Sequence, residues 1–131
     1  MMLDAGITHH KCATLAEAEM LASEKVPHVL VAYQMVGPNL NRVVGLIDKF
    51  PETRFALLVD NPLSLNQLVA VLTADTSESK RTAEVMIDLD SGMHRTGMAL
   101  AANPAECPAA ELYEMIAVSY THLTLPTIYP V

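Results

Sequence analysis

The sequence predicts an α/β protein built on a parallel β-sheet. Short apolar segments that suit strands alternate along the chain with amphipathic segments that suit helices. The strand segments are apolar throughout, which indicates burial on both faces, as in parallel sheets. Three of them end in a polar residue: Gln34, Asp60 or Asp90. These residues fall at the carboxyl edge of the predicted sheet, where enzymes built on a β/α barrel place their chemistry.

Each predicted element has a local reason. Thr14 is the predicted N-cap of the first helix, with Glu17 as its capping-box partner. Pro38 and Pro62 each stand where a helix is expected to begin. The predicted strands cover residues 8–14, 28–34, 54–60 and 84–90, and the predicted helices cover residues 15–25, 39–49, a segment from 61, and 103–117.

Two architectures fit this alternation, a doubly wound open sheet and a (β/α)8 barrel. No Gly-x-Gly-x-x-Gly sequence follows any of the predicted strands, so a dinucleotide-binding open sheet loses its main support. Composition and periodicity alone do not choose between the two. The 131 residues can bury one core, but a complete barrel takes about 250 residues.

Composition excludes several classes of function. The formal net charge of −7 disfavours nucleic acid, although a small anionic cofactor needs only one or two local donors. The apolar runs are too short to cross a membrane. Cys12 and Cys107 form no disulfide framework, and a cytoplasmic location is the expectation.

Residues 118–131 differ from the rest of the chain. After Glu114 the sequence contains no Asp, Glu, Lys or Arg, and the first ten residues of this tail resemble a translated sequencing adapter. We therefore interpret 118–131 as a non-native tail and 1–117 as the native domain. A tail of that origin should pack poorly and not take the place of the next strand. The alternative is a genuine edge strand, since Tyr, Thr and Leu favour strands.

Three segments carry a family resemblance. KCATLAEAEM at 11–20, AYQMVGPN at 32–39 and IDLDSGMHRTG at 87–97 resemble, in this order, segments of the D-threonine aldolase family, and the last also resembles a loop of alanine racemases. Any one segment alone would be weak, whereas the three together are specific. The resemblance covers residues 1 to about 117 and favours about four β/α units of a TIM-type (β/α)8 barrel, like the alanine racemase N-terminal domain.

The resemblance implies a pyridoxal-phosphate-dependent lyase that cleaves D-3-hydroxy amino acids to glycine and an aldehyde, with a divalent metal in a distal domain. A D-serine dehydratase, an amino-acid racemase and a non-catalytic carrier of pyridoxal phosphate are the alternatives. The family lysine that forms the Schiff base matches no residue here, and neither do the metal ligands. We therefore expect a piece truncated at both ends and inactive alone, from a cytoplasmic monomer or homodimer.

Arg95 is the leading candidate for cofactor binding, because the matching arginine in the related racemases donates to the phenolic oxygen of the cofactor. His94 beside it is the second candidate. Gly92 and Gly97 are expected to shape the loop. For Asp88 and Asp90, hydrogen bonds that fix the loop are expected rather than acid–base work.

The remaining polar residues have simpler interpretations. Lys11 lies mid-strand and is expected to be structural or solvated. His9 and His10 should point to opposite faces, which suits one metal poorly. Cys12 is expected in the core, and Asp60 is expected to cap the next helix.

Overall fold

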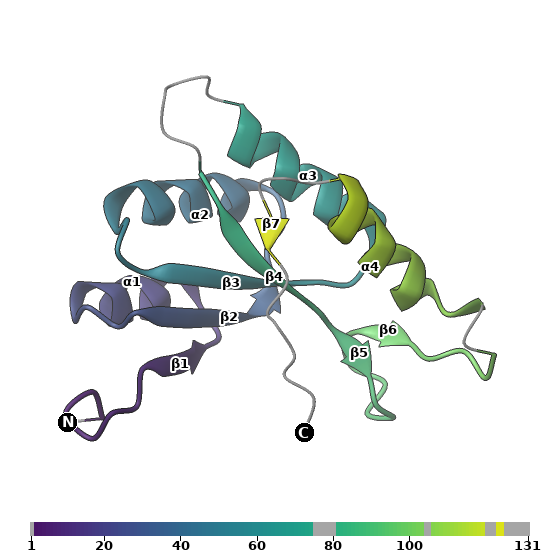
Figure 1. Cartoon of the computed structure of the whole chain (residues 1–131), viewed down its shortest axis with the longest axis horizontal. Helices are drawn as coiled ribbons and strands as arrows, with labels where there is room; N and C mark the ends of the chain where they lie inside the picture. Colours follow the sequence, from purple (N-terminus) through teal and green to yellow (C-terminus); the bar gives the residue numbers. More distant parts are fainter. Residues whose placement is uncertain (1, 75–80, 104–105, 120–122, 125–131) are drawn as a thin grey trace.

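The computed structural model describes residues 2–74, 81–103, 106–119 and 123–124 (Figure 1). The elements are β1 (His9–Cys12), α1 (Leu15–Ser23), β2 (His28–Gln34), α2 (Pro38–Lys49), β3 (Arg54–Val59), α3 (Pro62–Thr73), β4 (Ala83–Ile87), β5 (Leu89–Asp90), β6 (Met98–Ala99), α4 (Pro108–Ser119) and β7 (Leu123–Thr124). The predicted alternation of strands and helices is confirmed, and β2 has the predicted bounds.

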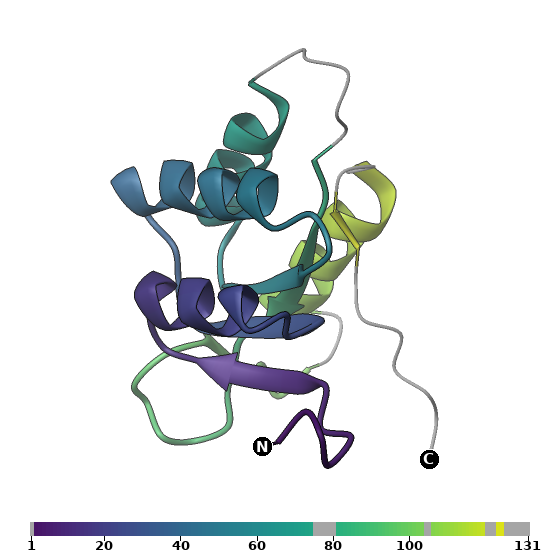
Figure 2. The ribbon, with the colours of Figure 1, turned by 90° about the vertical axis from the view of Figure 1, so that its left-hand side faces the viewer.

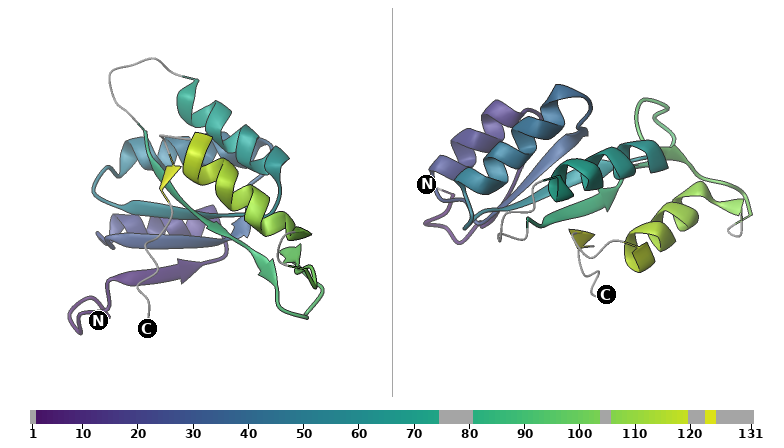
Figure 3. Two further views of the ribbon diagram at one scale, coloured as in Figure 1. Left: turned by 45° about the vertical axis from the view of Figure 1, so that its right-hand side comes forward. Right: turned by 90° about the horizontal axis from the view of Figure 1, so that it is seen from above.

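The main sheet is parallel and its strands follow the order of the chain. Its order is β1-β2-β3-β4-β7, with no reversal about a central strand. The helices lie along one side of this curved sheet (Figures 2 and 3). Sequential order with helices on one side distinguishes a partial barrel from a doubly wound sheet. The predicted partial (β/α)8 barrel is therefore confirmed.

The two faces of the sheet differ in burial. Residues paired across parallel strands share a face, so Val31, Leu57 and Val85 lie together in the core against the helices. Alternate residues such as Leu30 and Met86 lie on the opposite face, which we call the open face, and are half-buried. The prediction of strands buried on both faces is therefore wrong for the described chain. The helices cover only one side of the sheet, and no described element covers the other.

The helix starts follow from local chemistry. Thr14 and Glu17 form the predicted capping box, in which the backbone N–H of Glu17 donates to the Thr14 hydroxyl at 3.2 Å. Asn61 caps α3 by accepting from the backbone N–H of Ser64 at 2.8 Å. The prediction that Asp60 caps this helix is thus wrong. Its carboxylate accepts from the Asn61 side chain at 2.6 Å and orients the capping residue.

Two elements depart most from the sequence prediction. The fourth strand ends at Ile87, and the chain resumes pairing at Leu89–Asp90 in a separate small sheet with β6. The last helix begins at Pro108, later than predicted, because proline suits the first turn of a helix. It also continues through Ser119, past the predicted end of the native domain.

The segment at 118–131 contributes to the sheet. β7 pairs in parallel with β4, with Leu123 opposite Ala83 and Thr124 opposite Glu84. This two-residue pairing occupies the place of the next barrel strand, so the expectation of a conformation unrelated to that strand is wrong here. The rest of the segment after α4 lies outside the described residues. Its adapter origin stays a prediction.

Within the described ranges, the helices fall short of the length and hydrophobicity that a membrane span requires.

A core truncation tests the packing. Leu57 is 1% exposed at the centre of the sheet, so Leu57→Ala should lower the free energy of unfolding by about 2–5 kcal/mol. Leu63→Ala is the matched control, because Leu63 is 66% exposed in the first turn of α3 and its loss should cost about 0.5 kcal/mol or less. Urea unfolding followed by circular dichroism measures both. Equal losses would show that Leu57 is not in the core.

Candidate functional site

The carboxyl edge of the sheet holds a polar contact between two strands that are not neighbours. The side-chain amide of Gln34 at the end of β2 donates to Asp88 Oδ2, just after β4, at 2.9 Å. The backbone N–H of Asp88 donates to the Val59 carbonyl at the end of β3, also at 2.9 Å. One carboxylate residue thus links the ends of three strands. Both side chains of the Gln34–Asp88 contact are partly buried.

Asp90 holds the loop that follows. Its Oδ1 accepts from the backbone N–H groups of Gly92 at 2.8 Å and His94 at 3.0 Å, and its Oδ2 lies 2.8 Å from His94 Nδ1. These hydrogen bonds hold the pKa of Asp90 below its usual value, and the one from the His94 backbone N–H has the largest effect. Asp90 therefore remains an acceptor at neutral pH. The expected loop-fixing role is confirmed for this carboxylate.

Glycine is required at two positions of this loop. Gly92 has φ 112° and Gly97 has φ 92°, values that side chains disfavour. A Cβ at Gly97 would also lie 2.7 Å from the backbone nitrogen of Asp90. The close approach exists because β6 returns beside β5, with the backbone N–H of Met98 donating to the Asp88 carbonyl at 2.8 Å. The predicted shaping role of both glycines is confirmed.

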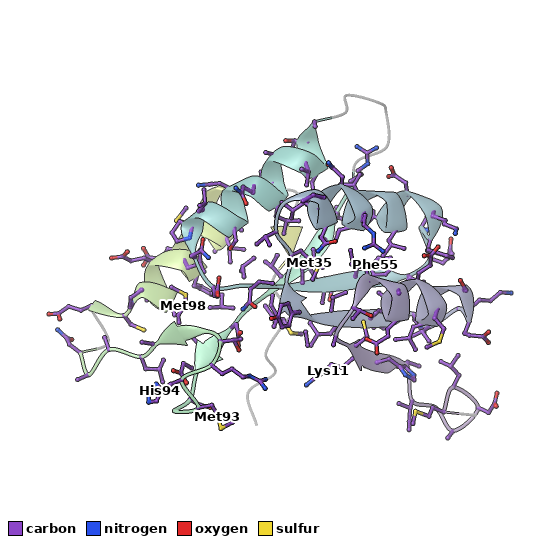
Figure 4. All side chains as sticks on the ribbon, turned by 180° about the vertical axis from the view of Figure 1, so that it is seen from behind. Lys11, Met35, Phe55, Met93, His94 and Met98 are labelled. Carbon is purple, nitrogen blue, oxygen red and sulfur yellow. The ribbon has the colours of Figure 1, made fainter. Side chains whose placement is uncertain are left out.

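The tip of the loop presents side chains to solvent. Met93 is 79% exposed, and the His94 side chain is 85% exposed at a positive φ of 52°. Both project from the end of the loop, away from the sheet (Figure 4). Arg95 is exposed next to them, and no residue in the described part of the chain accepts a hydrogen bond from it. Its guanidinium is thus available for an anionic ligand, and His94 is held by Asp90.

The candidates on β1 lie elsewhere. Lys11 is exposed on the open face of the edge strand β1, paired with Leu30, and lies apart from the loop that bears His94 (Figure 4). Cys12 is buried, its thiol donates to the Leu30 carbonyl at 3.6 Å, and burial raises its pKa. Cys12 is therefore a buried core thiol that is less readily ionised than a free cysteine.

The adjacent histidines separate as predicted. His9 pairs with His28 on the open face, and the two rings stack at 4.1 Å. His10 pairs with Val29, and its Nε2 lies 3.2 Å from the Ile7 carbonyl. Among the residues that the structure describes, no three His, Cys, Asp or Glu side chains are grouped to hold a metal ion. The stacked pair was not foreseen, because its members are far apart in sequence.

The close approach at Gly97 gives a direct test of the loop. Gly97→Ala should lower the free energy of unfolding by about 1–3 kcal/mol, because the new methyl group meets backbone atoms that cannot move independently. Amide chemical shifts of residues 88–98 should change with it. Gly45→Ala is the control, since Gly45 lies in α2 with open space around it. This substitution should raise the free energy of unfolding by up to about 1 kcal/mol, because alanine favours a helix over glycine. Unchanged loop shifts in Gly97→Ala would contradict the packing described.

Comparisons with known proteins identify the family. A search of the curated proteins finds no match to the chain. Among solved structures, D-threonine aldolase from Filomicrobium marinum is similar in fold, with a TM-score of 0.73 and 21% sequence identity. The similarity covers 88% of this chain and 28% of that chain, so this chain spans under a third of the aldolase. The family model of the alanine racemase N-terminal domain matches residues 1–124, and the chain therefore belongs to that family.

Proposed function

We propose that this chain forms part of the barrel of a pyridoxal-phosphate-dependent lyase of the D-threonine aldolase type. The family and the fold neighbour support a pyridoxal-phosphate enzyme. The observation that carries the proposal is the loop 90–97, which presents Arg95 at the carboxyl edge of a partial barrel. The lyase activity on D-3-hydroxy amino acids rests on the three resembling segments.

The chemistry of the loop fits an anionic ring cofactor. When bound, pyridoxal phosphate withdraws electrons from the Cα bond to be broken. The protein must then hold the ring in a fixed orientation, and a guanidinium does this because it stays charged and donates directionally to oxygen. Asp90 and Gly97 fix the loop before any ligand arrives, so that Arg95 starts from an ordered backbone. Pre-ordering of this kind lowers the entropy cost of binding.

His94 is the second proposed contact. Its Nδ1 faces the Asp90 carboxylate at 2.8 Å, which leaves Nε2 directed away from the loop. A ring held in this way can offer Nε2 to the cofactor or substrate as an acceptor when the ring is neutral and as a donor when it is protonated. Asp90 thus positions His94, and Arg95 supplies the fixed charge.

The described lysines do not supply an amine at this edge. Lys11 lies within the edge strand β1, Lys25 follows α1 at the opposite edge, and Lys49 pairs with Glu19 at 2.7 Å. Lys80 lies outside the described residues. We propose that the catalytic lysine and the ligands of a divalent metal belong to parts of the protein beyond this sequence. The chain by itself would then bind the cofactor without turnover.

A racemase, a D-serine dehydratase and a non-catalytic cofactor carrier would use the same barrel. The aldolase branch is favoured by the AYQMVGPN segment at 32–39, whose Gln34 meets Asp88 at the carboxyl edge. We propose a D-amino acid as the substrate and a cytoplasmic monomer or homodimer as the form of the complete protein.

Arg95→Ala tests the cofactor site with a probe that cannot condense with lysines. Pyridoxine 5′-phosphate, which lacks the aldehyde, should bind the chain and lose roughly tenfold or more in affinity in Arg95→Ala, since a charge-assisted hydrogen bond contributes about 1.5–3 kcal/mol. Titration followed by amide chemical shifts measures the affinity and should show the shifts at residues 90–97.

Arg42→Ala is the matched control, because Arg42 is an exposed arginine on α2 whose side chain bonds only Asn39 among the described residues. It should leave the affinity unchanged. Equal losses of affinity in the two variants would show that the effect comes from net charge, and would contradict a direct contact of Arg95 with the cofactor.

Trapping with borohydride tests the assignment of the lysines. Pyridoxal phosphate mixed with the chain and then reduced should label several lysines weakly and without saturation, because Lys11, Lys25 and Lys49 are exposed and a productive Schiff base needs a desolvated amine held over the ring. Peptide mass mapping measures the distribution. A saturable adduct at Lys11 alone would overturn the proposal and make Lys11 the catalytic amine.

A further inference from the structure

Asp88 lies at the base of the loop that carries Arg95. The chain leaves the main sheet after Ile87, the last residue of β4, and continues into β5 and β6 beyond the end of that strand (Figure 1). The backbone N–H of Met98, on the returning side of the loop, donates to the Asp88 carbonyl at 2.8 Å. Asp88 therefore stands where the outgoing and returning parts of the loop meet.

Among the described residues, backbone pairing ties this base to the main sheet at Asp88 itself. Its backbone N–H donates at 2.9 Å to the carbonyl of Val59, the last residue of β3. The next pair, Leu89 with Met98, belongs to the small sheet of β5 and β6. From Leu89 onward, the parallel ladder of the main sheet no longer determines where the loop lies.

The side chain of Asp88 supplies a second connection. Its Oδ2 accepts from the Gln34 side-chain amide at 2.9 Å, across the end of β3, and both side chains are partly buried. A hydrogen bond to a charged acceptor is stronger than one between neutral groups. Within the described part of the chain, Gln34 is the side-chain partner of Asp88. The loop is thus fastened to β2 as well as to β3.

The end of β2 is irregular just before Gln34. The pairing of β2 with β3 skips Ala32 and Tyr33, so that Gln34 lies opposite Leu58. Irregularities of this kind re-aim side chains and are frequent beside active sites. In an unbroken ladder Ala32, whose side chain has no hydrogen-bond donor, would take this place. The irregularity therefore brings an amide donor to the position opposite Leu58.

Asp90 and Asp88 have different tasks. The Asp90 carboxylate accepts from backbone N–H groups inside the loop and fixes the shape of the loop itself. The Asp88 carboxylate bonds Gln34, 54 residues earlier in the chain, and fixes the loop to the sheet. A loop of fixed shape still swings as a body when its base is free. The direction of Arg95 therefore depends on both carboxylates.

We propose that Gln34 is a positioning residue for Arg95, and that it acts through Asp88 to set the direction in which the loop presents the guanidinium to an anionic ligand. This role depends on the proposed cofactor site at Arg95. Gln34 itself makes no contact with the cofactor. It holds the base of the loop in one place before any ligand arrives, as a supporting side chain does for a binding group.

An isosteric exchange tests the contact without altering net charge. In the double variant Gln34→Glu with Asp88→Asn, carboxylate and amide change places, so the hydrogen bond is kept with its direction reversed. Gln34→Glu alone sets two carboxylates against each other, and like charges repel at this distance. In the ligand-free chain, the amide chemical shifts of residues 90–97 should change in Gln34→Glu and return toward the native values in the double variant. Gln67→Glu, at an exposed position of α3, is the charge-matched control and should leave these shifts unchanged.

Pyridoxine 5′-phosphate shows whether the place of the loop matters for binding. Its affinity should fall roughly fivefold or more in Gln34→Glu and return to within about twofold of the native value in the double variant. Gln34→Met removes the donor without adding charge. It should weaken binding in the native chain but not in an Arg95→Ala background, because a residue that acts through Arg95 then has nothing left to position. Equal losses in both backgrounds would overturn the proposal.

The ligand-free shifts separate this role from the cofactor site. Native affinity in Arg95→Ala would remove the cofactor site, whereas the shifts of residues 90–97 would still show whether Gln34 fixes the loop. Native shifts in both Gln34→Glu and Gln34→Met would remove the role of Gln34 and leave Arg95 in place. Should Gln34→Glu fail to fold, Gln34→Met and the double variant decide the matter by the same shifts.

Discussion

The parallel register of β2, β3 and β4 is the constraint on which the rest of the structure depends. Partners in a parallel ladder share a face, so the pairing of Val31 with Leu57 and of Leu57 with Val85 places all three beneath the helices. The same register sends Leu30 and its partners to the open face. Because parallel strands need a crossover each time, the helices return along one side of the sheet. Register thus decides which side chains meet.

The same constraint gathers chemistry at two opposite edges. At the carboxyl edge, Gln34 and Asp88 join strands that are not neighbours, and Asp90 orders the loop that carries Arg95. At the amino edge, histidines and cations from successive strands meet around one hollow. The hydrogen bonds at the carboxyl edge are internal to the chain, whereas the cations of the amino edge face solvent. The carboxyl edge is therefore ordered by contacts within the chain.

The sequence predicted most of the fold because the responsible signals are local. The bounds of β2, the Thr14 cap and the loop glycines each depend on neighbouring residues. The cap at Asn61 was misassigned to Asp60, because two adjacent residues can both cap and only backbone geometry separates them. Burial on both faces was wrongly expected, since hydrophobic content does not reveal whether an element covers the second face. Contacts such as Gln34 with Asp88 depend on register and have no local signature.

Local pairing, more than net charge, decides which charged groups of this acidic chain are left for a ligand. The carboxylates of Asp88 and Asp90 already accept hydrogen bonds from groups of the chain itself, and these bonds partly compensate their negative charge. Arg95 stands outside this network and keeps its charge available. At the amino edge, the Glu84 carboxylate lies 3.5 Å from Arg54 Nη1. The net charge of −7 disfavours a polyanion, which needs a broad basic surface, yet it carries no information about a small site that needs only a few donors.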